Sequence, residues 1–391
     1  MSLGLNLLYF APCELYEGLG GSARLENMTS IFQQLGLKIR LISYISKEKF
    51  KVKHEKINNL LSMTKIYVSR SSPKLIKALA IPVLLLYGLK YVKKSEIIFA
   101  HAPGIMTGFP AMILARLFNK PLIIDHMDVK DPDTPRIIYD MVLRYSTAVF
   151  TISHYLEEEV KRKFKRKAIY VPIFIDTTLF QKNDLERKKI RKNLGIRDKD
   201  ILIGYVGSFW YVEGVPVLLK AFKSLIKKYE NIRLIVIGRM NLQSDNIPLL
   251  IEKLSLRKNA ILIPQQPRKL IPNYLSACEI LCSPKIDCEI NRAANPVKVI
   301  EYLAIGLPVV CSAVGGIVDA IKDGFNGLLV KPGDIKDLEE KLEFIILNPE
   351  QAKEMGKNGR KTVIENYSSN SIETKIKQAL IKIRDITKDA L

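Results

Sequence analysis

The chain alternates short apolar runs with longer stretches in which apolar and polar residues mix at helical spacing. Strands that alternate with helices are typical of a parallel α/β sheet. A glycine turn near residue 20 opens the first helix, and Gly36 ends it. In this first half we predict short buried strands at residues 3–10, 38–43, 97–100, 121–125, 148–152 and 168–171.

A second alternation of the same kind starts at residue 201, and the residues after Asp334 are predicted to be helical. A chain of 391 residues is too long for one typical domain and suits two domains of similar size. We therefore predict the α/β class, with two Rossmann-like domains that each contain a parallel sheet. The strands of the second domain are predicted at residues 201–206, 233–237, 260–263, 280–283, 308–311 and 327–330.

The segment 295–316 (NPVKVIEYLAIGLPVVCSAVGG) says most about function. Asn295 is expected to cap a helix whose first residue is Pro296. Lys298 and Glu301 then lie three residues apart on one face of its first two turns. A helix N-terminus that carries a lysine suits a diphosphate, and a carboxylate one turn later can accept hydrogen bonds from both hydroxyls of a ribose. The segment therefore predicts a site for a sugar nucleotide.

The order of these motifs resembles the retaining glycosyltransferases of family 4. That family has a helix with Glu-Tyr-Leu-Ala, followed by Gly-x-Pro-Val-Val and by Gly-Gly. The match continues through the segment 323–334 (DGFNGLLVKPGD), and the Pro-x-Lys-x-x-Glu-Tyr pattern at 296–302 is similar to one branch of the family. The residues that match in order and spacing are Glu301, Tyr302, Ala304, Gly306, Pro308, Val309, Gly315 and Gly316.

The resemblance implies the GT-B fold, in which two Rossmann-like domains face a central cleft. The segment 171–180 (VPIFIDTTLF) is similar to the family's inter-domain connection. Residues 1–175 would then form the acceptor domain, and residues 176–368 the domain that binds the nucleotide sugar. The final helix of this fold crosses back onto the first domain, which would place residues 369–391 there.

The resemblance also implies an enzyme, which moves a hexose from a nucleotide sugar to a glycan or lipid-linked acceptor and retains the anomeric configuration. Such enzymes usually work without a metal, so no metal or other cofactor is expected. The leaving diphosphate then needs fixed cations or dipoles beside it. The alternative is a catalytically silent homologue that acts as a binding partner or scaffold. A nucleotide-sugar epimerase of the same fold is a third option.

In the first domain, the resemblance singles out the loop with Gly20 and Gly21, which meets the donor in that family. It also singles out His126, which would lie beside the transferred sugar. His126 follows a predicted strand, and ligands gather at the carboxyl ends of strands in open α/β sheets. His101, which follows another strand, is a second candidate. Two further side chains are expected to line the cleft, Asp128 and Asp131.

Three positions depart from the family's pattern: Ser208 stands for an arginine, Glu213 for a lysine and Ala293 for a glutamate. This loss motivates the silent alternative. Lys298 is the first-ranked substitute cation, ahead of Arg292 and Arg239. Catalytic roles are predicted for His126, Lys298 and Glu301. Donor-binding roles are predicted for Gly20, Gly21, Ser208, Arg239, Lys298, Glu301, Gly315 and Gly316.

The formal net charge of +21 is locally concentrated, because residues 38–94 contain fourteen lysines and arginines against two glutamates. Basic patches attract nucleic acid or anionic lipid, and the lack of interleaved aromatic or helix-turn-helix signals argues against nucleic acid. The apolar stretch 75–92 is too short to span a bilayer. An interfacial amphipathic helix and a buried helix of the first domain fit it equally well. A lysine-rich surface of the thermophile type is the plain alternative.

The five cysteines contain no CxxC pair and predict neither a disulfide framework nor a metal site. The first residues show no secretory pattern. A cytoplasmic location is therefore expected, with a peripheral contact at the cytoplasmic membrane face through residues 38–94.

Overall fold

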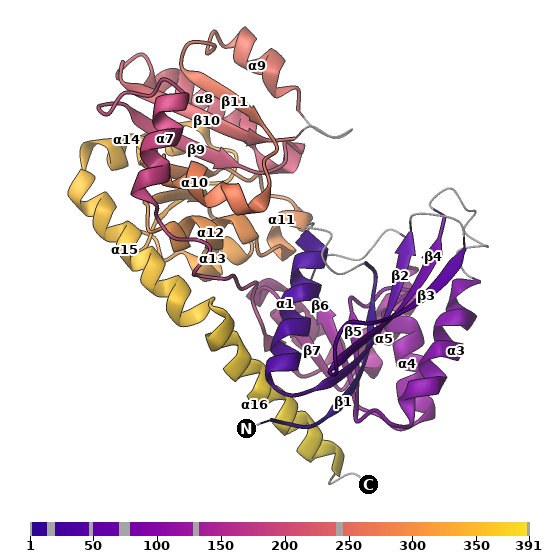
Figure 1. Ribbon diagram of the computed structural model, residues 1–391. Coiled ribbons are helices and arrows are strands. Elements are labelled where there is room, and N and C mark those ends of the chain that lie inside the picture. The colour runs from indigo at the N-terminus through magenta and orange to yellow at the C-terminus, as the bar shows by residue number, and fades with distance from the viewer. Residues whose placement is uncertain are drawn as a thin grey trace. The chain divides into compact units, whose positions relative to one another are not determined.

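The computed structural model describes residues 2–13, 20–46, 50–69, 79–127, 133–239 and 245–388, without the side chains of residues 20–23 and 386–388. Its contacts divide the chain into two compact units (Figure 1). Unit 1 comprises Met1–Pro172 and Ile372–Leu391, and unit 2 comprises Ile173–Ser371. The boundaries predicted from the sequence lie after residues 175 and 368.

Unit 1 contains, within its described residues, an eight-stranded sheet of order β3-β4-β2-β1-β5-β6-β7-β8. All neighbouring strands pair in parallel except β3, which is antiparallel to β4. The strands are β1 (Asn6–Ala11), β2 (Lys38–Ser46), β3 (Lys51–Lys56), β4 (Leu61–Val68), β5 (Ile97–His101), β6 (Leu122–His126), β7 (Ala148–Thr151) and β8 (Ala168–Tyr170).

The β3–β4 hairpin is absent from the sequence prediction. β3 has the sequence KVKHEK and none of its residues is buried, so no apolar pattern marks it as a strand. Strand β4 is mostly buried and supplies the partner that makes β3 a strand. The other six strands occur where the sequence predicts them.

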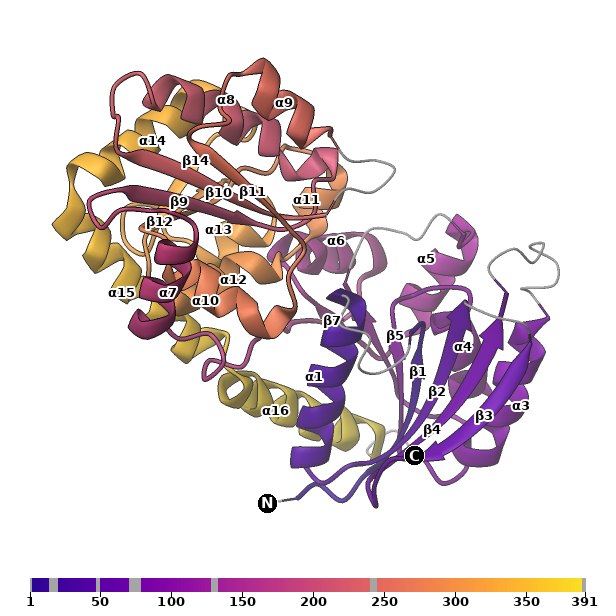
Figure 2. The ribbon, with the colours of Figure 1, turned by 45° about the horizontal axis from the view of Figure 1, so that its top comes forward.

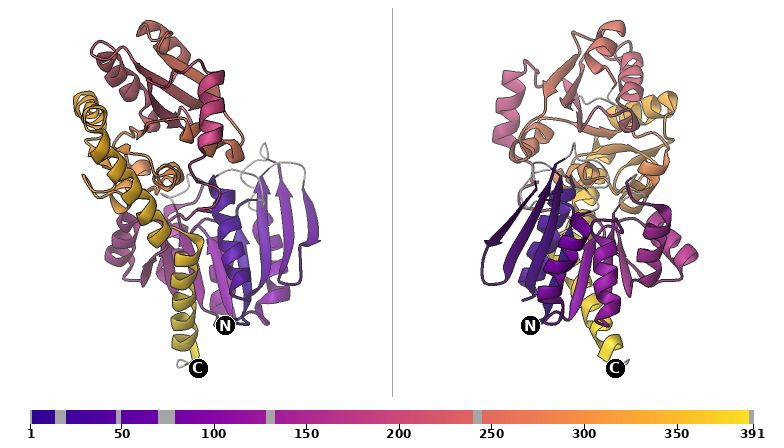
Figure 3. Two further views of the ribbon diagram at one scale, coloured as in Figure 1. Left: turned by 60° about the vertical axis from the view of Figure 1, so that its left-hand side comes forward. Right: turned by 90° about the vertical axis from the view of Figure 1, so that its right-hand side faces the viewer.

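Helices cover both faces of the unit 1 sheet (Figure 3). One face packs against α3, α4 and α5, whose buried residues join one hydrophobic core with the sheet. The last helix contributes a buried stripe to this unit from residue 372 onward, formed by Ile372, Ile376, Leu380 and Ile383. The helices are α1 (Gly20–Gln34), α3 (Ala80–Val92), α4 (Gly108–Leu117), α5 (Arg136–Tyr145), α6 (His154–Phe164) and α16 (Ser369–Lys388).

Helix α3 forms most of the apolar stretch 75–92, of which residues 75–78 lie outside the described residues. Ala80, Leu84, Gly88 and Val92 form its buried face. Its opposite face is exposed. The helix therefore packs in the first domain, and the interfacial role stays a prediction. Among the described residues, no helix combines the length and the apolar character needed to cross a membrane.

In the part of unit 2 that the structure describes, six parallel strands form a sheet of order β11-β10-β9-β12-β13-β14. Each strand predicted there is confirmed. The order doubles back at β9 and β12, as it does in Rossmann folds, where ligands bind at such a switch point beyond the carboxyl ends of the strands. The strands are β9 (Ile201–Val206), β10 (Ile232–Gly238), β11 (Ala260–Pro264), β12 (Ile280–Ser283), β13 (Val309–Ser312) and β14 (Leu328–Val330).

Figure 2 shows α8, α9 and α14 on one face of this sheet and α7, α10 and α12 on the other. Each face has its own hydrophobic core. The helices are α7 (Asp184–Asn193), α8 (Val215–Leu225), α9 (Ile247–Lys253), α10 (Ile271–Ser276), α11 (Glu289–Ala293), α12 (Val297–Ile305), α13 (Gly316–Ala320), α14 (Ile335–Leu347) and α15 (Pro349–Asn366). Two short 3-10 turns are η1 (Tyr211–Glu213) and η2 (Arg268–Leu270).

The start of α12 corrects one prediction. Asn295 is not its cap: the N-cap is Pro296, without a side-chain hydrogen bond, and the helix begins at Val297. Asn295 is instead buried against the backbone of Gly316, where a Cβ would lie 2.8 Å from its side chain. Tertiary packing thus uses the residue whose local preference is for capping. Gly306 ends the helix with a φ of 79°, as predicted.

Candidate functional site

The switch point of unit 2 brings charged side chains from three segments together. Glu213 lies in η1, in the turn after β9. Lys285 follows β12 by two residues, and the first turn of α12 carries Lys298. Val206 and Ser283 end the two central strands, so these segments meet at the carboxyl edge of the sheet. That is the edge at which a Rossmann sheet binds ligands.

Lys298 is fixed by two contacts. Its Nζ donates to the hydroxyl of Tyr205 at 3.1 Å and to a carboxylate oxygen of Glu213 at 2.6 Å. It also lies 4.5 Å from the centre of the Tyr205 ring, within range of a cation–π interaction. A Cβ on Gly207 would lie 2.4 Å from Nζ, so glycine at this position leaves room for the ammonium group.

Glu213 lies between two lysines. One carboxylate oxygen accepts from Lys298 and the other from Lys285 at 3.0 Å. Burial by itself would raise the pKa of Glu213, but the charges and hydrogen bonds of the two lysines outweigh it and lower the pKa to about 2. The carboxylate is therefore charged at every physiological pH.

Lys285 is the most deeply buried charge of this cluster, with a side chain that is 6% exposed. Its Nζ also donates to Oδ1 of Asn291 at 2.9 Å. The amide of Asn291 donates in turn to the carbonyl oxygens of Val212 and Ile286, both at 2.8 Å. Burial lowers the pKa of Lys285, against the opposing effect of Glu213.

Glu301 lies one turn further along α12 and is also buried. One of its carboxylate oxygens accepts from the guanidinium of Arg268 at 3.0 Å. Arg268 lies in η2 after β11, 5.7 Å from the centre of the Phe180 ring. Burial raises the pKa of Glu301, and the charge of Arg268 opposes that rise.

The two glycines after β13 have a packing role. Gly315 has a φ of 55°, and a Cβ there would lie 2.0 Å from the carbonyl oxygen of Asn291. The N–H of Gly316 donates to the carbonyl of Ala294 at 2.8 Å. They bring the loop after β13 against α11, which carries Asn291, and against Ala294 directly after it. Their predicted contact with a donor stays a prediction.

The other predicted cations and Ser208 are placed less centrally. The carbonyl of Ser208 accepts from the hydroxyl of Tyr205 at 2.7 Å. Arg239 follows β10 and is exposed. Arg292 forms a bidentate pair with Asp287, with both distances at 2.7 Å. Within the described residues, the structure therefore brings Lys298 together with Lys285 and not with Arg292.

In unit 1, His126 is the last residue of β6 and is buried. The hydroxyl of Tyr139 lies 2.9 Å from its Nε2. Among the described residues, no hydrogen-bond partner reaches its Nδ1. Burial lowers the pKa of His126 to about 4, so the imidazole is neutral at pH 7.

His101 ends the neighbouring strand β5 and belongs to a structural network. Its Nδ1 lies 3.5 Å from the hydroxyl of Tyr9 and 3.7 Å from a carboxylate oxygen of Asp125. Asp125 forms a buried bidentate pair with Arg24 of α1, at 2.8 and 3.2 Å. Arg24 also donates to the carbonyl oxygen of Pro172 at 2.7 Å. Burial lowers the pKa of His101 to about 4.

Some predicted residues lie outside the description. Asp128 and Asp131 are outside the described residues. Gly20 and Gly21 begin α1 as predicted, but the loop before them, residues 14–19, is also outside. Where the structure describes the chain, no three His, Cys, Asp or Glu side chains gather as a metal site requires. The expectation of metal-free chemistry is not tested by this.

Three members of the site were missed at the sequence level, namely Lys285, Tyr205 and Arg268. Lys285 and Arg268 each follow a strand of unit 2 within a few residues of its carboxyl end. That position, in a domain with the Rossmann pattern, was the available signal. Tyr205 lies inside β9, where its hydroxyl gives no sequence signal.

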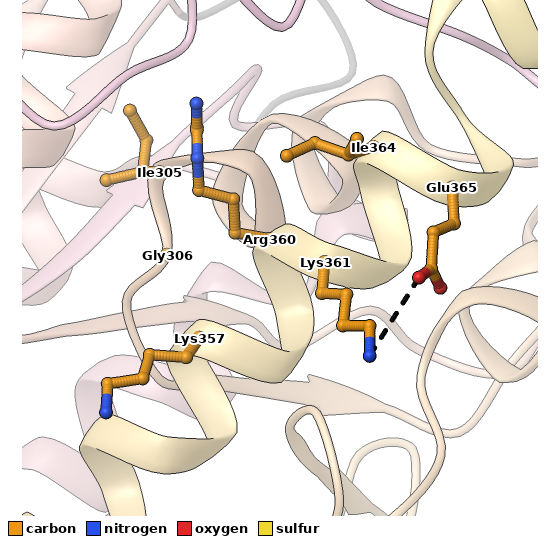
Figure 4. Close-up of a pocket in the computed structure, with 7 residues that line it drawn as sticks. All are labelled: Ile305, Gly306, Lys357, Arg360, Lys361, Ile364 and Glu365. Atoms are coloured by element: carbon orange, nitrogen blue, oxygen red, sulfur yellow. Dashed lines mark ion pairs between the residues drawn. The ribbon is translucent and has the colours of Figure 1, made fainter.

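A cavity of about 430 Å³ in unit 2, away from the charged cluster, is lined by basic side chains that do not converge on one point. Figure 4 shows Lys357, Arg360 and Lys361 pointing from α15 in different directions. Arg360 donates to the carbonyl oxygens of Phe180 and Ala304, and Lys361 pairs with Glu365 at 4.0 Å. These cations are engaged in packing or on the surface, so this cavity is not the candidate site.

Comparison with known protein families finds a match for most of unit 2. Residues 186–362 match the family model described as glycosyl transferases group 1. This part of the chain is a glycosyltransferase group 1 domain. The matched residues include Glu213, Lys285, Lys298 and Glu301, so the charged cluster at the switch point belongs to the glycosyltransferase domain. Assignment to the retaining family 4 and to one branch of it stays a prediction.

A curated relative and two solved structures extend the comparison. One relative is the capsular polysaccharide biosynthesis glycosyltransferase CapM of Staphylococcus aureus, which is 28% identical over 196 residues. The match covers 49% of this chain and 49% of CapM, so it spans about half of each protein. Sucrose-phosphate synthase from Thermosynechococcus elongatus superposes with a TM-score of 0.79 at 17% identity, over 97% of this chain and 99% of that chain. HepE of Anabaena in complex with UDP gives 0.75 at 15% identity, over 97% and 100%.

These superpositions concern the fold, because both identities are low. They confirm the predicted GT-B fold, which has two α/β domains whose sheets are almost entirely parallel. The glycosyltransferase group 1 match lies in the second of these, unit 2. The cleft predicted between the domains stays a prediction.

The shifted pKa of Glu213 predicts a pH dependence of stability. A carboxylate whose pKa is lowered from 4.5 to about 2 by folding stabilises the folded state above pH 4.5, and this contribution is lost as the pH falls through that range. Between pH 6 and pH 3 the stability advantage of the wild type over Glu213→Gln should shrink by about 2 kcal/mol. The measurement is urea unfolding followed by the fluorescence of Trp210, the only tryptophan and a residue of unit 2.

The exposed Glu354 pairs with Lys357 at 3.2 Å and supplies the matched control. Glu354→Gln should follow the wild type across this pH range. Parallel curves for wild type and Glu213→Gln would contradict the assigned role of the two lysines.

Proposed function

We propose that this protein transfers a hexose from a nucleotide sugar to a glycan or lipid-linked acceptor, with retention of configuration. The observation that carries the proposal is α12, a buried helix inside the glycosyltransferase group 1 domain. Its first two turns present the ammonium of Lys298 and the carboxylate of Glu301 at the carboxyl edge of the sheet. These are the two groups that a nucleoside diphosphate needs.

The diphosphate would meet Lys298, with Lys285 as a second fixed cation behind it. These two lysines and Glu213 together carry a net charge of +1, which supports the developing charge of the leaving group without a metal. Glu301 would accept hydrogen bonds from the ribose, with Arg268 on its other side. Further donor contacts are proposed for Gly20, Gly21, Ser208, Arg239, Gly315 and Gly316.

The acceptor and the transferred sugar would contact unit 1. His126 would donate from Nδ1 to a sugar hydroxyl while Tyr139 donates to Nε2, which suits a neutral imidazole. Retention on this fold would proceed by front-side attack, in which an oxygen of the leaving phosphate takes the acceptor's proton. CapM, a relative named for capsular polysaccharide biosynthesis, supports a glycan acceptor.

The silent alternative was motivated by the missing cations, and the structure weakens that motive. Lys285 is a buried cation that the sequence analysis did not predict, and it pairs with Glu213 at 3.0 Å. A scaffold without a ligand at this edge would gain little from two lysines beside it, because burying charge is costly. Turnover of a nucleotide sugar distinguishes the two functions.

Calorimetric titration with UDP, GDP and ADP, with EDTA present, tests the donor site. One nucleotide should bind at about millimolar affinity or tighter, roughly −4 kcal/mol or better. Lys298→Met and Glu301→Ala should each weaken that binding at least tenfold, because each removes charged hydrogen bonds to the ligand.

Lys336→Met is the control, since its side chain on α14 is 85% exposed and its removal should leave the affinity within twofold. If no nucleotide binds the wild type, the donor proposal fails and the scaffold function gains. If only Glu301→Ala binds normally, the ribose assignment fails alone.

The exposed face of α3 supports a membrane-bound acceptor. Leu86 is 62% exposed and Leu89 42% exposed, and Lys90 and Lys93 lie on the same exposed side. The neighbouring strand β3 packs its His54 ring on Tyr87 of α3, at 5.2 Å, and its exposed Lys56 lies on the same face of the strand as His54. Apolar side chains flanked by lysines suit the headgroup region of an anionic bilayer. We therefore place the protein at the cytoplasmic membrane face.

Flotation with vesicles of phosphatidylglycerol and phosphatidylcholine tests this surface. The wild type should float at low salt and lose most binding in 0.5 M salt, because the lysines act through screened charge. The double variant Leu86→Asp, Leu89→Asp should bind at least tenfold less, since two leucines no longer enter the lipid.

The exposed Leu117 of α4 gives a matched control, and Leu117→Asp should float like the wild type. Absence of flotation at low salt, or an equal loss in the Leu117 variant, would remove the membrane contact from the proposal.

A further inference from the structure

Glu213 carries a negative charge where the resembled family carries a lysine for the diphosphate. In this chain the cations come from other elements and converge on that carboxylate, Lys285 from the loop after β12 and Lys298 from α12. The positive charges are therefore present at this edge of the sheet, but they come from positions 285 and 298, and position 213 carries the negative charge.

The turn that carries Glu213 is fixed to the sheet from two sides. The neighbouring Val212 is buried, and its carbonyl accepts from the N–H of Ile286 at 3.2 Å and from Asn291 at 2.8 Å. On the other side, Gly214 has a φ of 70°, and a Cβ there would lie 1.9 Å from the carbonyl oxygen of Pro284. The carboxylate therefore has little freedom to move away from the two lysines.

A lysine has a long flexible side chain, and ordering it costs conformational entropy. Lys298 has three N–H donors, of which one meets Tyr205 and one meets Glu213. These two contacts fix the direction of the third. Without Glu213, Lys298 and Lys285 would be two like charges at one place, and Lys298, the less buried of the two, would turn away.

We propose that Glu213 is a positioning residue: it fixes the ammonium of Lys298 at the carboxyl end of β9, so that the remaining N–H points at the donor's diphosphate. Lys285 and Asn291 fix the carboxylate in turn. This inference rests on the proposed function for the identity of the ligand. The arrangement of Lys298 itself is independent of it.

Charge alone and positioning predict opposite effects of Glu213→Gln. The substitution raises the local net charge from +1 to +2, so charge alone would tighten the binding of a nucleoside diphosphate. Positioning predicts that affinity falls, because Lys298 loses its partner and its direction. We expect the nucleotide that binds the wild type to bind Glu213→Gln at least tenfold more weakly in calorimetry.

Two further variants complete the series. Glu213→Asp keeps the charge on a side chain one methylene shorter, so its affinity should lie between those of the wild type and Glu213→Gln. Glu354→Gln removes the same charge from an exposed ion pair on α15 and should stay within twofold of the wild type. Unchanged or tighter binding by Glu213→Gln would overturn the positioning role.

A second measurement needs no nucleotide. Brief acetylation, with mass spectrometry of each lysine, reports how accessible the amine of Lys298 is relative to the exposed Lys336. The rate at Lys298 should rise severalfold in Glu213→Gln and less in Glu213→Asp, while Glu354→Gln leaves it unchanged. An unchanged rate in Glu213→Gln overturns the inference whether or not a nucleotide binds.

The two failures are distinguishable. If the wild type binds no nucleotide but acetylation of Lys298 rises in Glu213→Gln, the proposed donor site fails and Glu213 still positions the lysine. If Glu213→Gln does not fold, as judged by circular dichroism, the calorimetry and the acetylation are both done on Glu213→Asp instead. A wild-type affinity together with a wild-type acetylation rate in that variant would then overturn the positioning role.

Discussion

The ion pairs of Glu213 with Lys285 and Lys298 join three segments of unit 2: the turn after β9, the loop after β12 and the start of α12. Breaking a buried pair by removing one partner leaves an uncompensated charge, which is strongly destabilising. Each of the three segments is therefore constrained by the other two. The fixed ammonium of Lys298 is the consequence that matters most for a glycosyltransferase domain.

The location of this cluster follows from the strand order. β9 lies at the centre of the sheet, and the chain leaves it in one direction through β10 and β11 and returns beside it at β12. The connections after β9 and β12 lead to helices on opposite faces of the sheet, α8 and α12 (Figure 2), while their loops pack against each other at the carboxyl edge. Glu301 and Arg268 extend the polar groups of the same edge towards β11, and in the proposed function they would bind the ribose next to the diphosphate.

Unit 1 uses buried polar groups in a different way. Arg24 and Asp125 form a complete pair, which ties α1 to the end of β6 and to the chain segment after β8. The next residue, His126, is neutral because of burial and contacts Tyr139. The carboxylate of Asp125 thus serves packing, and the adjacent imidazole of His126 is the group that we propose for contact with the sugar.

The resemblance of the motifs to a known family implied the GT-B fold. The sequence by itself determined the strands of both sheets that have buried apolar runs and the spacing that puts Lys298 and Glu301 on one helix. These are local patterns, because strand and helix periods repeat over a few residues. Only the tertiary structure decided that β3 is a strand, that Asn295 packs against a glycine turn instead of capping α12, and that Glu213 meets both lysines. The two contacts of Glu213 join residues that are 72 and 85 positions apart, so they depend on the order of the strands and have no local signal.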